Sequence, residues 1–358
     1  MLDSSSKRDD IMRRSLLGLA AAALVGIAVA LLIYGSSASH ASVARARPAA
    51  TTTTGASQAP AGTTVSSQAL ASWRRRNWPA LTGRVHLTRT WTIQYHAHNG
   101  VRRVALVVLP RWYGPRNNPP IPLVISPHGR GVEPAGNVRL WGNMPALGRF
   151  AVVTPEGAGT SRLELYSWGS PGQIDDLGRM PTIVKHALPW LRIAPHRTYA
   201  IGGSMGGQET LLLLAEHPHL LAGAISFDAP TNMTARYYAF RKLPYGLALQ
   251  KLARLEFGGV PRKRGEAFAD SSPIYYSREL AFSHVPLQIW WSTRDRTVVD
   301  QAHESGLLYR AIMGLNPSAP VTQFIGTWAH TAEMHATGQM PLALAHIGLL
   351  DLAGTGAK

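Results

Sequence analysis

The chain has 358 residues, of which 45% are hydrophobic, so it can bury the core of one large or two small domains. It contains no cysteine, which excludes disulfides, thiolate catalysis and cysteine-ligated metal sites. The formal net charge is +16, but the basic residues are scattered and form no recognisable nucleic-acid module, so we expect no nucleic-acid partner.

The first 34 residues have the pattern of a membrane-targeting segment. Residues 1–14 carry basic side chains and are expected to stay cytoplasmic, and residues 15–34 are an apolar run without a charge. About 20 apolar residues can cross a bilayer as a helix. We therefore expect a single-pass cell membrane protein with an extracytoplasmic catalytic domain. A cleaved signal, with secretion, is the alternative, because Arg13 and Arg14 resemble a twin-arginine export signal.

Residues 35–72 consist mostly of Ala, Ser, Thr, Gly and Pro, with almost no large apolar side chain. Such a segment cannot bury enough surface to offset the entropy lost on ordering, so we expect a disordered tether. The folded domain is then expected to span residues 73–352, and it contains no internal repeat.

Short apolar segments alternate with helical patterns in the domain. Residues 84–98 and 101–110 predict a β-hairpin around Asn99 and Gly100. Six further strands are predicted, at 121–129, 150–157, the segment that ends before Ser204, 222–230, 285–295 and 319–330, with helices that include 175–191 and 301–313. This alternation predicts an α/β fold, with a mostly parallel sheet of eight strands covered by helices on both faces. Functional residues in such sheets lie at the carboxyl ends of the strands.

Residues 199–218 (YAIGGSMGGQETLLLLAEHP) place Ser204 among four glycines, between a predicted buried strand and a leucine-rich predicted helix. A sharp strand-to-helix turn favours glycine, because a Cβ resists the backbone angles and collides where strand and helix approach closely. Gly202-x-Ser204-x-Gly206 therefore matches the nucleophile elbow. A phosphate-binding loop is disfavoured, because no lysine follows the glycines.

A serine nucleophile needs a base to take its proton and a carboxylate to orient that base. Asp295 follows the predicted seventh strand and His330 follows the eighth. Ser204, Asp295 and His330 therefore occur in the order of a Ser-Asp-His triad, each at a predicted strand end. We expect these three residues to be catalytic.

Other residues stay open for the same roles. Asp228 also ends a predicted strand and is an alternative acid, and His335 is an alternative base. His303 and His128 are weaker candidates for the base. No ligand pattern such as H-E-x-x-H occurs among the histidines, so we expect no metal and no cofactor.

The negative oxygen of a tetrahedral intermediate needs two backbone N–H donors. The residue after the nucleophile, Met205, is one expected donor. The other is expected from the loop SPHGRG at 126–131, from Gly129 or Arg130, with Arg130 preferred. The side chain of Arg130 is also a candidate for attracting an anionic group of the substrate.

Taken together, these motifs resemble the α/β-hydrolase superfamily, and most closely its esterase and prolyl-oligopeptidase-like members. The resemblance covers about residues 106–349 and rests on PHGRG, GGSMGG and the stretch from Ser271 to Val298, which has Pro286 before a strand and then Asp295. One departure is the replacement, within WWSTRD, of the glycine that usually precedes the acid. The resemblance implies an α/β-hydrolase fold with a lid insertion after the sixth strand, here residues 229–284.

No β-propeller precedes the domain, so we expect a serine carboxylic-ester hydrolase rather than a peptidase. A small-molecule or envelope ester is the expected substrate. An acyltransferase or a peptidase with the same triad is an alternative, as is a catalytically silent envelope-binding module. The sequence leaves the oligomeric state open.

Overall fold

The computed structural model describes residues 66–160, 165 and 167–352. The segments predicted to be cytoplasmic (1–14) and apolar (15–34) lie outside the described residues. Within the described residues, no helix is both long enough and apolar enough to cross a membrane. This finding contradicts the predicted single-pass membrane localisation.

The folded part begins earlier than predicted, because α2 spans Ser67–Leu81 and includes the last residues of the predicted tether at 35–72. The hydroxyl of Ser66 caps the helix by accepting a backbone N–H at 3.0 Å. Leu70 and Trp73 lie one turn apart and are buried in the core. A capping serine and two buried side chains therefore order a segment whose composition alone indicated disorder.

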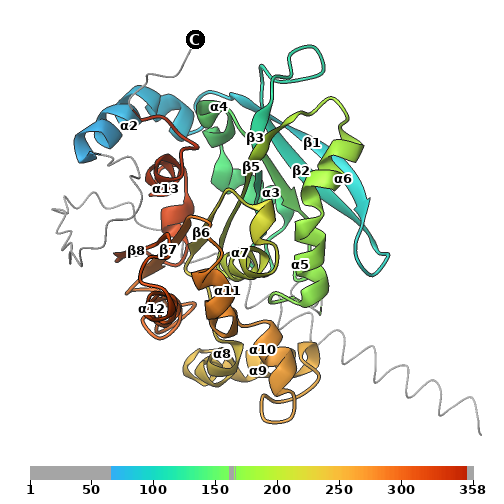
Figure 1. Ribbon diagram of the computed structural model, residues 1–358, viewed down its shortest axis with the longest axis vertical. Coiled ribbons are helices and arrows are strands. Elements are labelled where there is room, and N and C mark those ends of the chain that lie inside the picture. The colour runs from blue at the N-terminus through green and yellow to red at the C-terminus, as the bar shows by residue number, and fades with distance from the viewer. Residues whose placement is uncertain (1–65, 161–164, 166, 353–358) are drawn as a thin grey trace, which may run out of the picture. The chain divides into compact units, whose positions relative to one another are not determined.

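Eight strands form one sheet (Figure 1). Their order across the sheet is β1-β2-β4-β3-β5-β6-β7-β8. Their bounds are β1 Thr88–His96, β2 Arg102–Pro110, β3 Ile121–Ile125, β4 Ala151–Pro155, β5 Ile193–Gly203, β6 Gly223–Phe227, β7 Leu287–Ser292 and β8 Val321–Gly326. The predicted number of strands and the predicted hairpin of β1 and β2 are confirmed. Gly100 has a positive φ of 78° at the hairpin turn, where glycine is favoured.

β2 is antiparallel to both of its neighbours, and all other neighbouring strands are parallel. The carboxyl ends of β3 to β8 therefore meet at one edge of the sheet. Ser204 and Asp228 follow β5 and β6 directly, and Asp295 and His330 lie shortly beyond β7 and β8. The topology thus brings the predicted site residues to the same edge.

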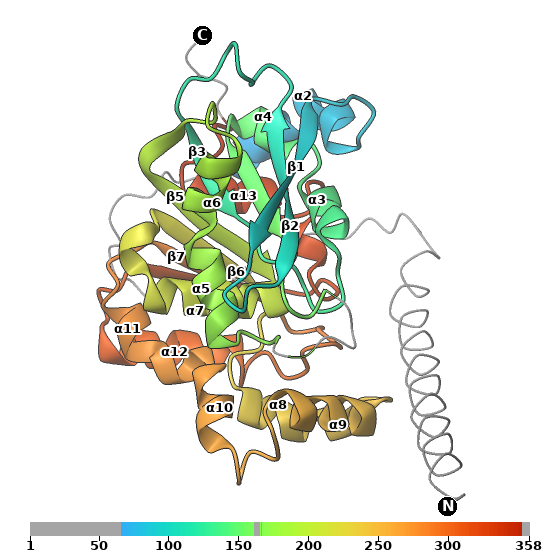
Figure 2. The ribbon, with the colours of Figure 1, turned by 90° about the vertical axis from the view of Figure 1, so that its right-hand side faces the viewer.

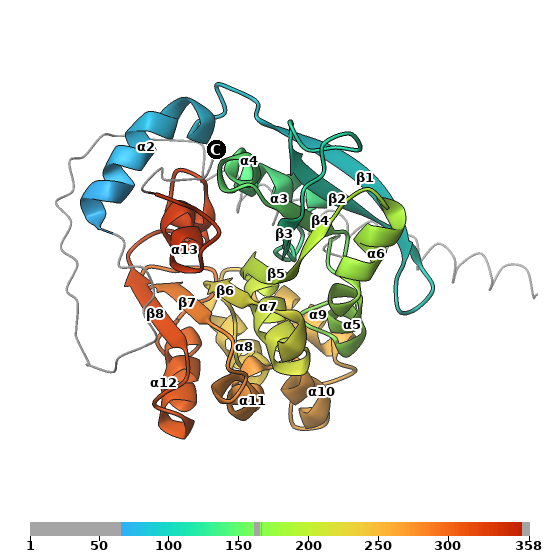
Figure 3. The same ribbon diagram turned by 45° about the horizontal axis from the view of Figure 1, so that its top comes forward.

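Alternate residues of the strands are buried in two separate apolar clusters. Figure 3 shows helices on both faces of the sheet. One layer contains α5, α6, α7, α11 and α12, and the other contains α2, α3, α4 and α13. The bounds are α3 Pro134–Trp141, α4 Met144–Gly148, α5 Pro171–Gly178, α6 Met180–Ala187, α7 Met205–Glu216, α8 Met233–Ala239, α9 Gly246–Glu256, α10 Gly265–Asp270, α11 Ser277–Ala281, α12 Ser305–Leu315 and α13 Met340–His346, with short 3₁₀ helices η1 Pro218–Leu220, η2 Phe240–Lys242, η3 Pro273–Tyr276 and η4 Ala332–Met334. The prediction of helices on both faces is confirmed.

The helix predicted at 175–191 is instead two helices, α5 and α6, which end and begin on either side of Arg179. Pro181 lies in the first turn of α6 and has no N–H to donate to the preceding turn, so it favours a new helix start at this point. The helix predicted at 301–313 begins only at Ser305.

The insertion predicted at 229–284 is helical. Figure 2 shows α8, α9 and α10 side by side at one end of the domain, while α11 returns to the helices that cover the sheet. The insertion has its own apolar cluster, which includes Tyr237, Phe240 and Phe268 and extends to Met205 at the start of α7. The assignment of residues 229–284 as a lid stays a prediction.

The turn from β5 to α7 is built by backbone segments in very close approach. A Cβ added at Gly202 would lie 2.4 Å from the carbonyl oxygen of Gly206. A Cβ added at Gly206 would lie 2.3 Å from the carbonyl oxygen of Pro127, in the loop after β3. Both neighbours are backbone atoms that cannot rotate away, so only glycine fits at these two positions.

We predict that Gly206→Ala lowers the free energy of unfolding by about 1–3 kcal/mol, because the new methyl group forces the loop after β3, which contains Pro127, away from α7. Gly314→Ala in α12 is the matched control. A Cβ at Gly314 meets nothing within 4 Å, so alanine should stabilise that helix by about 0.5–1 kcal/mol. Urea unfolding of both variants measures the difference. Equal effects of the two substitutions would contradict the close approach.

Candidate active site

Ser204 stands between β5 and α7 in a backbone conformation that only a few side chains adopt. Its φ is 59° and its ψ is −127°, a combination that costs about 1–3 kcal/mol for a residue with a Cβ. Its N–H donates to the carbonyl of Phe227 at 2.8 Å, and its own carbonyl accepts from Gln208 at 3.1 Å. These bonds and the surrounding glycines hold the strained turn, which presents the half-buried Ser204 at the edge of the sheet.

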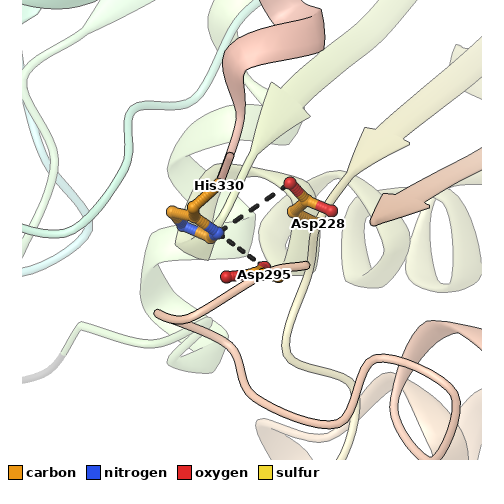
Figure 4. A group of neighbouring side chains, drawn as sticks. All are labelled: Asp228, Asp295 and His330. Carbon is orange, nitrogen blue, oxygen red and sulfur yellow. Dashed lines mark hydrogen bonds and ion pairs between the residues drawn. The ribbon is translucent and has the colours of Figure 1, made fainter. Parts of the chain in front are cut away.

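His330 and Asp295 form a short hydrogen bond at the same edge. The Nδ1 atom of His330 lies 2.7 Å from Oδ2 of Asp295 (Figure 4). The other oxygen of Asp295 accepts the backbone N–H groups of Thr297 at 2.7 Å and Val298 at 3.0 Å, and Gln301 donates to Oδ2 at 3.2 Å. The carboxylate is therefore fixed by its own loop and oriented toward the imidazole.

Asp295 is ionised in this setting. Burial by itself would raise the pKa of Asp295, but the hydrogen bond and charge of His330, with the bonds from Thr297 and Gln301, hold the pKa below its usual value. An ionised carboxylate can only accept a hydrogen bond, so Nδ1 of His330 is the donor and Nε2 is the nitrogen able to take a proton. His330 is thus arranged as a base.

Asp228, the alternative acid, lies farther from the imidazole, with Oδ2 3.9 Å from Nδ1 of His330 (Figure 4). Its oxygens accept backbone N–H groups instead, from Ser292 at 2.9 Å and from Thr331 at 2.8 Å. Burial raises the pKa of Asp228, although the charge of His330 opposes the rise. The geometry favours Asp295 as the acid, and Asp228 joins the end of β7 to the segment that carries His330.

The segment after His330 packs directly beside the nucleophile turn. A Cβ added at Gly203 would lie 2.9 Å from Sδ of Met334 and 3.0 Å from the side chain of Thr331. Among the described residues, no hydrogen bond joins Ser204 Oγ to His330. Hydrogen bonds between nucleophile and base often shorten only when substrate is bound, so this geometry is compatible with catalysis.

His128, a weaker candidate for the base, holds the loop after β3. Its Nδ1 lies 2.8 Å from the carbonyl oxygen of Gly129, to which it donates, and its Nε2 accepts from the backbone of Gly157 at 3.2 Å and the hydroxyl of Thr160 at 3.1 Å. Burial lowers the pKa of His128 and keeps the ring neutral. His128 is therefore bonded at both nitrogens and has no nitrogen left to act as a base.

These bonds also fix the peptide between Gly129 and Arg130. The carbonyl of Gly129 accepts from both His128 and Val132. Because a peptide is planar and trans, the N–H of Arg130 points opposite to that carbonyl, away from His128. A Cβ at Gly129 would lie 3.8 Å from Cβ of Ser204, so this peptide is adjacent to the nucleophile. The geometry favours Arg130 over Gly129 as the donor from this loop.

The side chain of Arg130 does not have the role expected from the sequence. Its guanidinium forms an ion pair with Glu256 at 2.5 Å, hydrogen-bonds to Ser167 and lies 4.3 Å over the ring of Trp168. The Arg130 side chain is only 12% exposed. Because Glu256 already pairs with the guanidinium, the structure disfavours the expectation that Arg130 attracts an anionic group of the substrate.

The remaining candidates lie elsewhere or have other roles. His335 is exposed beyond the short helix η4, and His303 is exposed and bonds Asp300 at 2.8 Å. The ligand atoms of Asp228, Asp295 and His330 lie within 4.8 Å of one another, close enough for a metal ion. However, the Nδ1 proton lies between His330 and Asp295, so the arrangement fits an acid–base pair better.

A buried carboxylic acid three residues after His330 was not predicted from the sequence. Glu333 in η4 is 2% exposed, and its carboxyl group lies against Asp228 and Trp328. Burial, with the nearby charge of Asp228, raises the pKa of Glu333 to about 10, so it is neutral at pH 7. Nothing in the sequence distinguishes Glu333 from a surface acid, since the pattern around it is not periodic.

Comparison with known proteins gives no sequence relative, since no protein-family model and no curated protein matches the chain. Solved structures do match. Two are prolyl oligopeptidase B from Galerina marginata, bound to a 35mer hydrolysis and macrocyclization substrate or to a 25mer macrocyclization substrate. They have 13% and 12% identity and TM-scores of 0.54 and 0.53, and each covers 74% of this chain.

A third similar structure is a protein provisionally named as a dipeptidyl aminopeptidase IV from Bacteroides ovatus, with 15% identity, a TM-score of 0.52 and 72% of this chain covered. The chain spans only 37%, 36% and 34% of the length of these three proteins. At these identities the likeness shows the fold alone. The chain has the α/β-hydrolase fold, as the sequence predicted.

We predict that Glu333→Gln changes how stability depends on pH. The raised pKa of Glu333 means that the folded chain keeps a proton that the unfolded chain loses above about pH 4.5. Wild-type stability should therefore fall relative to the variant as pH rises from about 5 to about 9, by up to ~1.4 kcal/mol per unit. Denaturant unfolding at several pH values measures this difference in the free energy of unfolding between wild type and Glu333→Gln. Glu266→Gln, at an exposed position of α10, is the control, and a pH-independent difference at Glu333 would refute the prediction.

Proposed function

We propose that this chain is a serine hydrolase that cleaves an acyl bond through an acyl-enzyme, with Ser204, Asp295 and His330 as the triad. The observation that carries the proposal is the 2.7 Å hydrogen bond between His330 Nδ1 and Asp295, at the edge where Ser204 occupies the strained elbow. The α/β-hydrolase fold supports the same conclusion, because its known triads lie at this edge.

In the proposed reaction, Nε2 of His330 takes the proton of Ser204 Oγ as that oxygen attacks the carbonyl carbon of the substrate. Ionised Asp295 stabilises the imidazolium that forms. The N–H groups of Met205 and Arg130 bind the negative oxygen of the tetrahedral intermediate. His330 then gives the proton to the leaving group. In the second half of the reaction His330 takes a proton from water as the water attacks the acyl-enzyme, and it returns that proton to Ser204 Oγ as the acid product leaves.

The substrate class is also part of the proposal. The similar structures are named as peptidases, which supports a peptide bond as the first candidate and puts the carboxylic ester expected from the sequence second. One similar structure is bound to a substrate of both hydrolysis and macrocyclization, which favours acyl transfer as a second candidate activity. The acyl-enzyme would then pass its acyl group to an amine or alcohol instead of water.

The triad assignment predicts unequal effects of the two aspartates. Ser204→Ala and His330→Ala should cause equally large losses of kcat, because nucleophile and base act as a unit. Asp295→Asn should lower kcat roughly 10⁴-fold, because the amide favours the wrong tautomer of His330. Asp228→Asn should lose much less, since one acceptor oxygen remains for a backbone N–H.

The measurement is steady-state hydrolysis of activated esters and of peptide amides by the folded protein and these variants. A larger loss in Asp228→Asn than in Asp295→Asn would transfer the role of the acid to Asp228. Equal activity of wild type and Ser204→Ala would contradict the proposal altogether.

A competition between acceptors distinguishes the proposed activities. A peptidase should cleave peptide amides as well as activated esters, whereas a carboxylic-ester hydrolase should cleave the esters alone. Product analysis with an added amine or alcohol then tests acyl transfer. Formation of the acylated acceptor at the expense of the free acid would indicate a transferase, and products unchanged by the acceptor would indicate a hydrolase.

A further inference from the structure

The Arg130 side chain connects the loop after β3 to the helical insertion between β6 and β7. Glu256, its ion-pair partner at 2.5 Å, is the last residue of α9. Ser167 bonds both partners, since its hydroxyl donates to Glu256 at 2.8 Å and accepts from Arg130. The insertion is therefore joined, through charged and hydrogen-bonded groups, to the residue whose N–H is proposed to bind the oxyanion.

Trp168 connects the same insertion to the second proposed donor. Its indole lies under the Arg130 guanidinium and stacks on Phe257, just beyond α9, with the rings 6.1 Å apart and 12° from parallel. The backbone N–H of Trp168 donates to Sδ of Met205 at 3.4 Å. One cluster of side chains thus contacts both residues of the proposed oxyanion hole.

The backbone at Trp168 is strained, because its φ is 51°, a value that a bulky side chain rarely adopts. Such conformations persist only where the surroundings impose them, and they gather at functional sites. Gly159, in the loop after β4, permits the arrangement, since a Cβ there would lie 2.6 Å from Cβ of Ser167 and 3.3 Å from the Arg130 guanidinium. The fold therefore makes room for this cluster at a cost in backbone energy.

A net gain in stability does not explain a buried ion pair well. The Glu256 side chain is 1% exposed, and removing two charges from water costs about as much as their attraction returns. A buried pair does fix orientation, because breaking it leaves an uncompensated charge. Arg130 and Glu256 therefore suit a positioning role at the site.

We propose that Arg130, Glu256 and Trp168 form a positioning unit that holds the backbone N–H groups of Arg130 and Met205 in place for the oxyanion. Turnover then depends on the position of the helical insertion relative to the loop after β3. The inference rests on the proposed serine hydrolase function and adds to it a role for the insertion. Glu256 and Trp168 act through their neighbours, so they are positioning residues. Loosening the unit displaces the N–H of Arg130 from the developing negative oxygen and leaves the contacts of bound substrate in place.

The test compares Glu256→Gln, which keeps the size of the side chain and removes its charge, with Glu266→Gln, an exposed position in the same insertion. We expect Glu256→Gln to lower kcat by about 10- to 100-fold with little change in KM, and to slow phosphonylation of Ser204 by a fluorophosphonate to a similar extent, because that reaction uses the same oxyanion hole. Glu256→Asp, which keeps the charge, should recover part of the loss. Glu266→Gln should leave both rates unchanged.

Trp168→Phe is the second variant, because it removes the indole from beneath the guanidinium and keeps an aromatic ring in the cluster. It should show the same fall in kcat with unchanged KM. Wild-type kcat in both Glu256→Gln and Trp168→Phe, in an enzyme that loses activity on Ser204→Ala, would overturn the positioning unit and leave the proposed function intact. If Ser204→Ala kept the activity of the wild type, both the positioning unit and the proposed serine hydrolase function would be contradicted.

Discussion

The strained backbone at Ser204 is the constraint on which the rest of the site depends. Its φ of 59° is tolerated because the turn is closed by the bond to Phe227 and by glycines whose missing Cβ atoms let α7 approach the loop after β3. The same approach places Met205 at the start of α7 and Arg130 on that loop beside the nucleophile. A single local conformation therefore sets the nucleophile and both proposed oxyanion donors.

Burial, hydrogen bonds and neighbouring charges together explain why three buried acids near one edge of the sheet have different pKa shifts. Asp295 accepts two backbone N–H groups, an amide and the imidazole of His330, and its pKa is lowered. Asp228 accepts two backbone N–H groups and its pKa is raised by burial. Glu333 lies against Asp228, and burial together with the charge of Asp228 raises the pKa of Glu333 to about 10. The chain thus keeps a negative charge on Asp295 beside His330, while Glu333 is neutral at pH 7.

The features with a local signature could be predicted from the sequence. The elbow at Ser204, the eight strands and the order of Asp295 and His330 follow from glycines, apolar segments and strand ends. Contacts between distant segments could not be predicted, because Glu256 and Trp168 lie far from Arg130 in the chain and carry no motif.

The central claim is that Ser204 is a nucleophile activated by His330. Labelling of the folded protein with a fluorophosphonate, followed by mass spectrometry of the tryptic peptide that contains Ser204, tests it most directly. We expect one adduct per chain, on Ser204, and its loss in His330→Ala, because the hydroxyl reacts only when the imidazole takes its proton. An unlabelled Ser204 in the folded protein, or labelling that persists in His330→Ala at the wild-type rate, would contradict it.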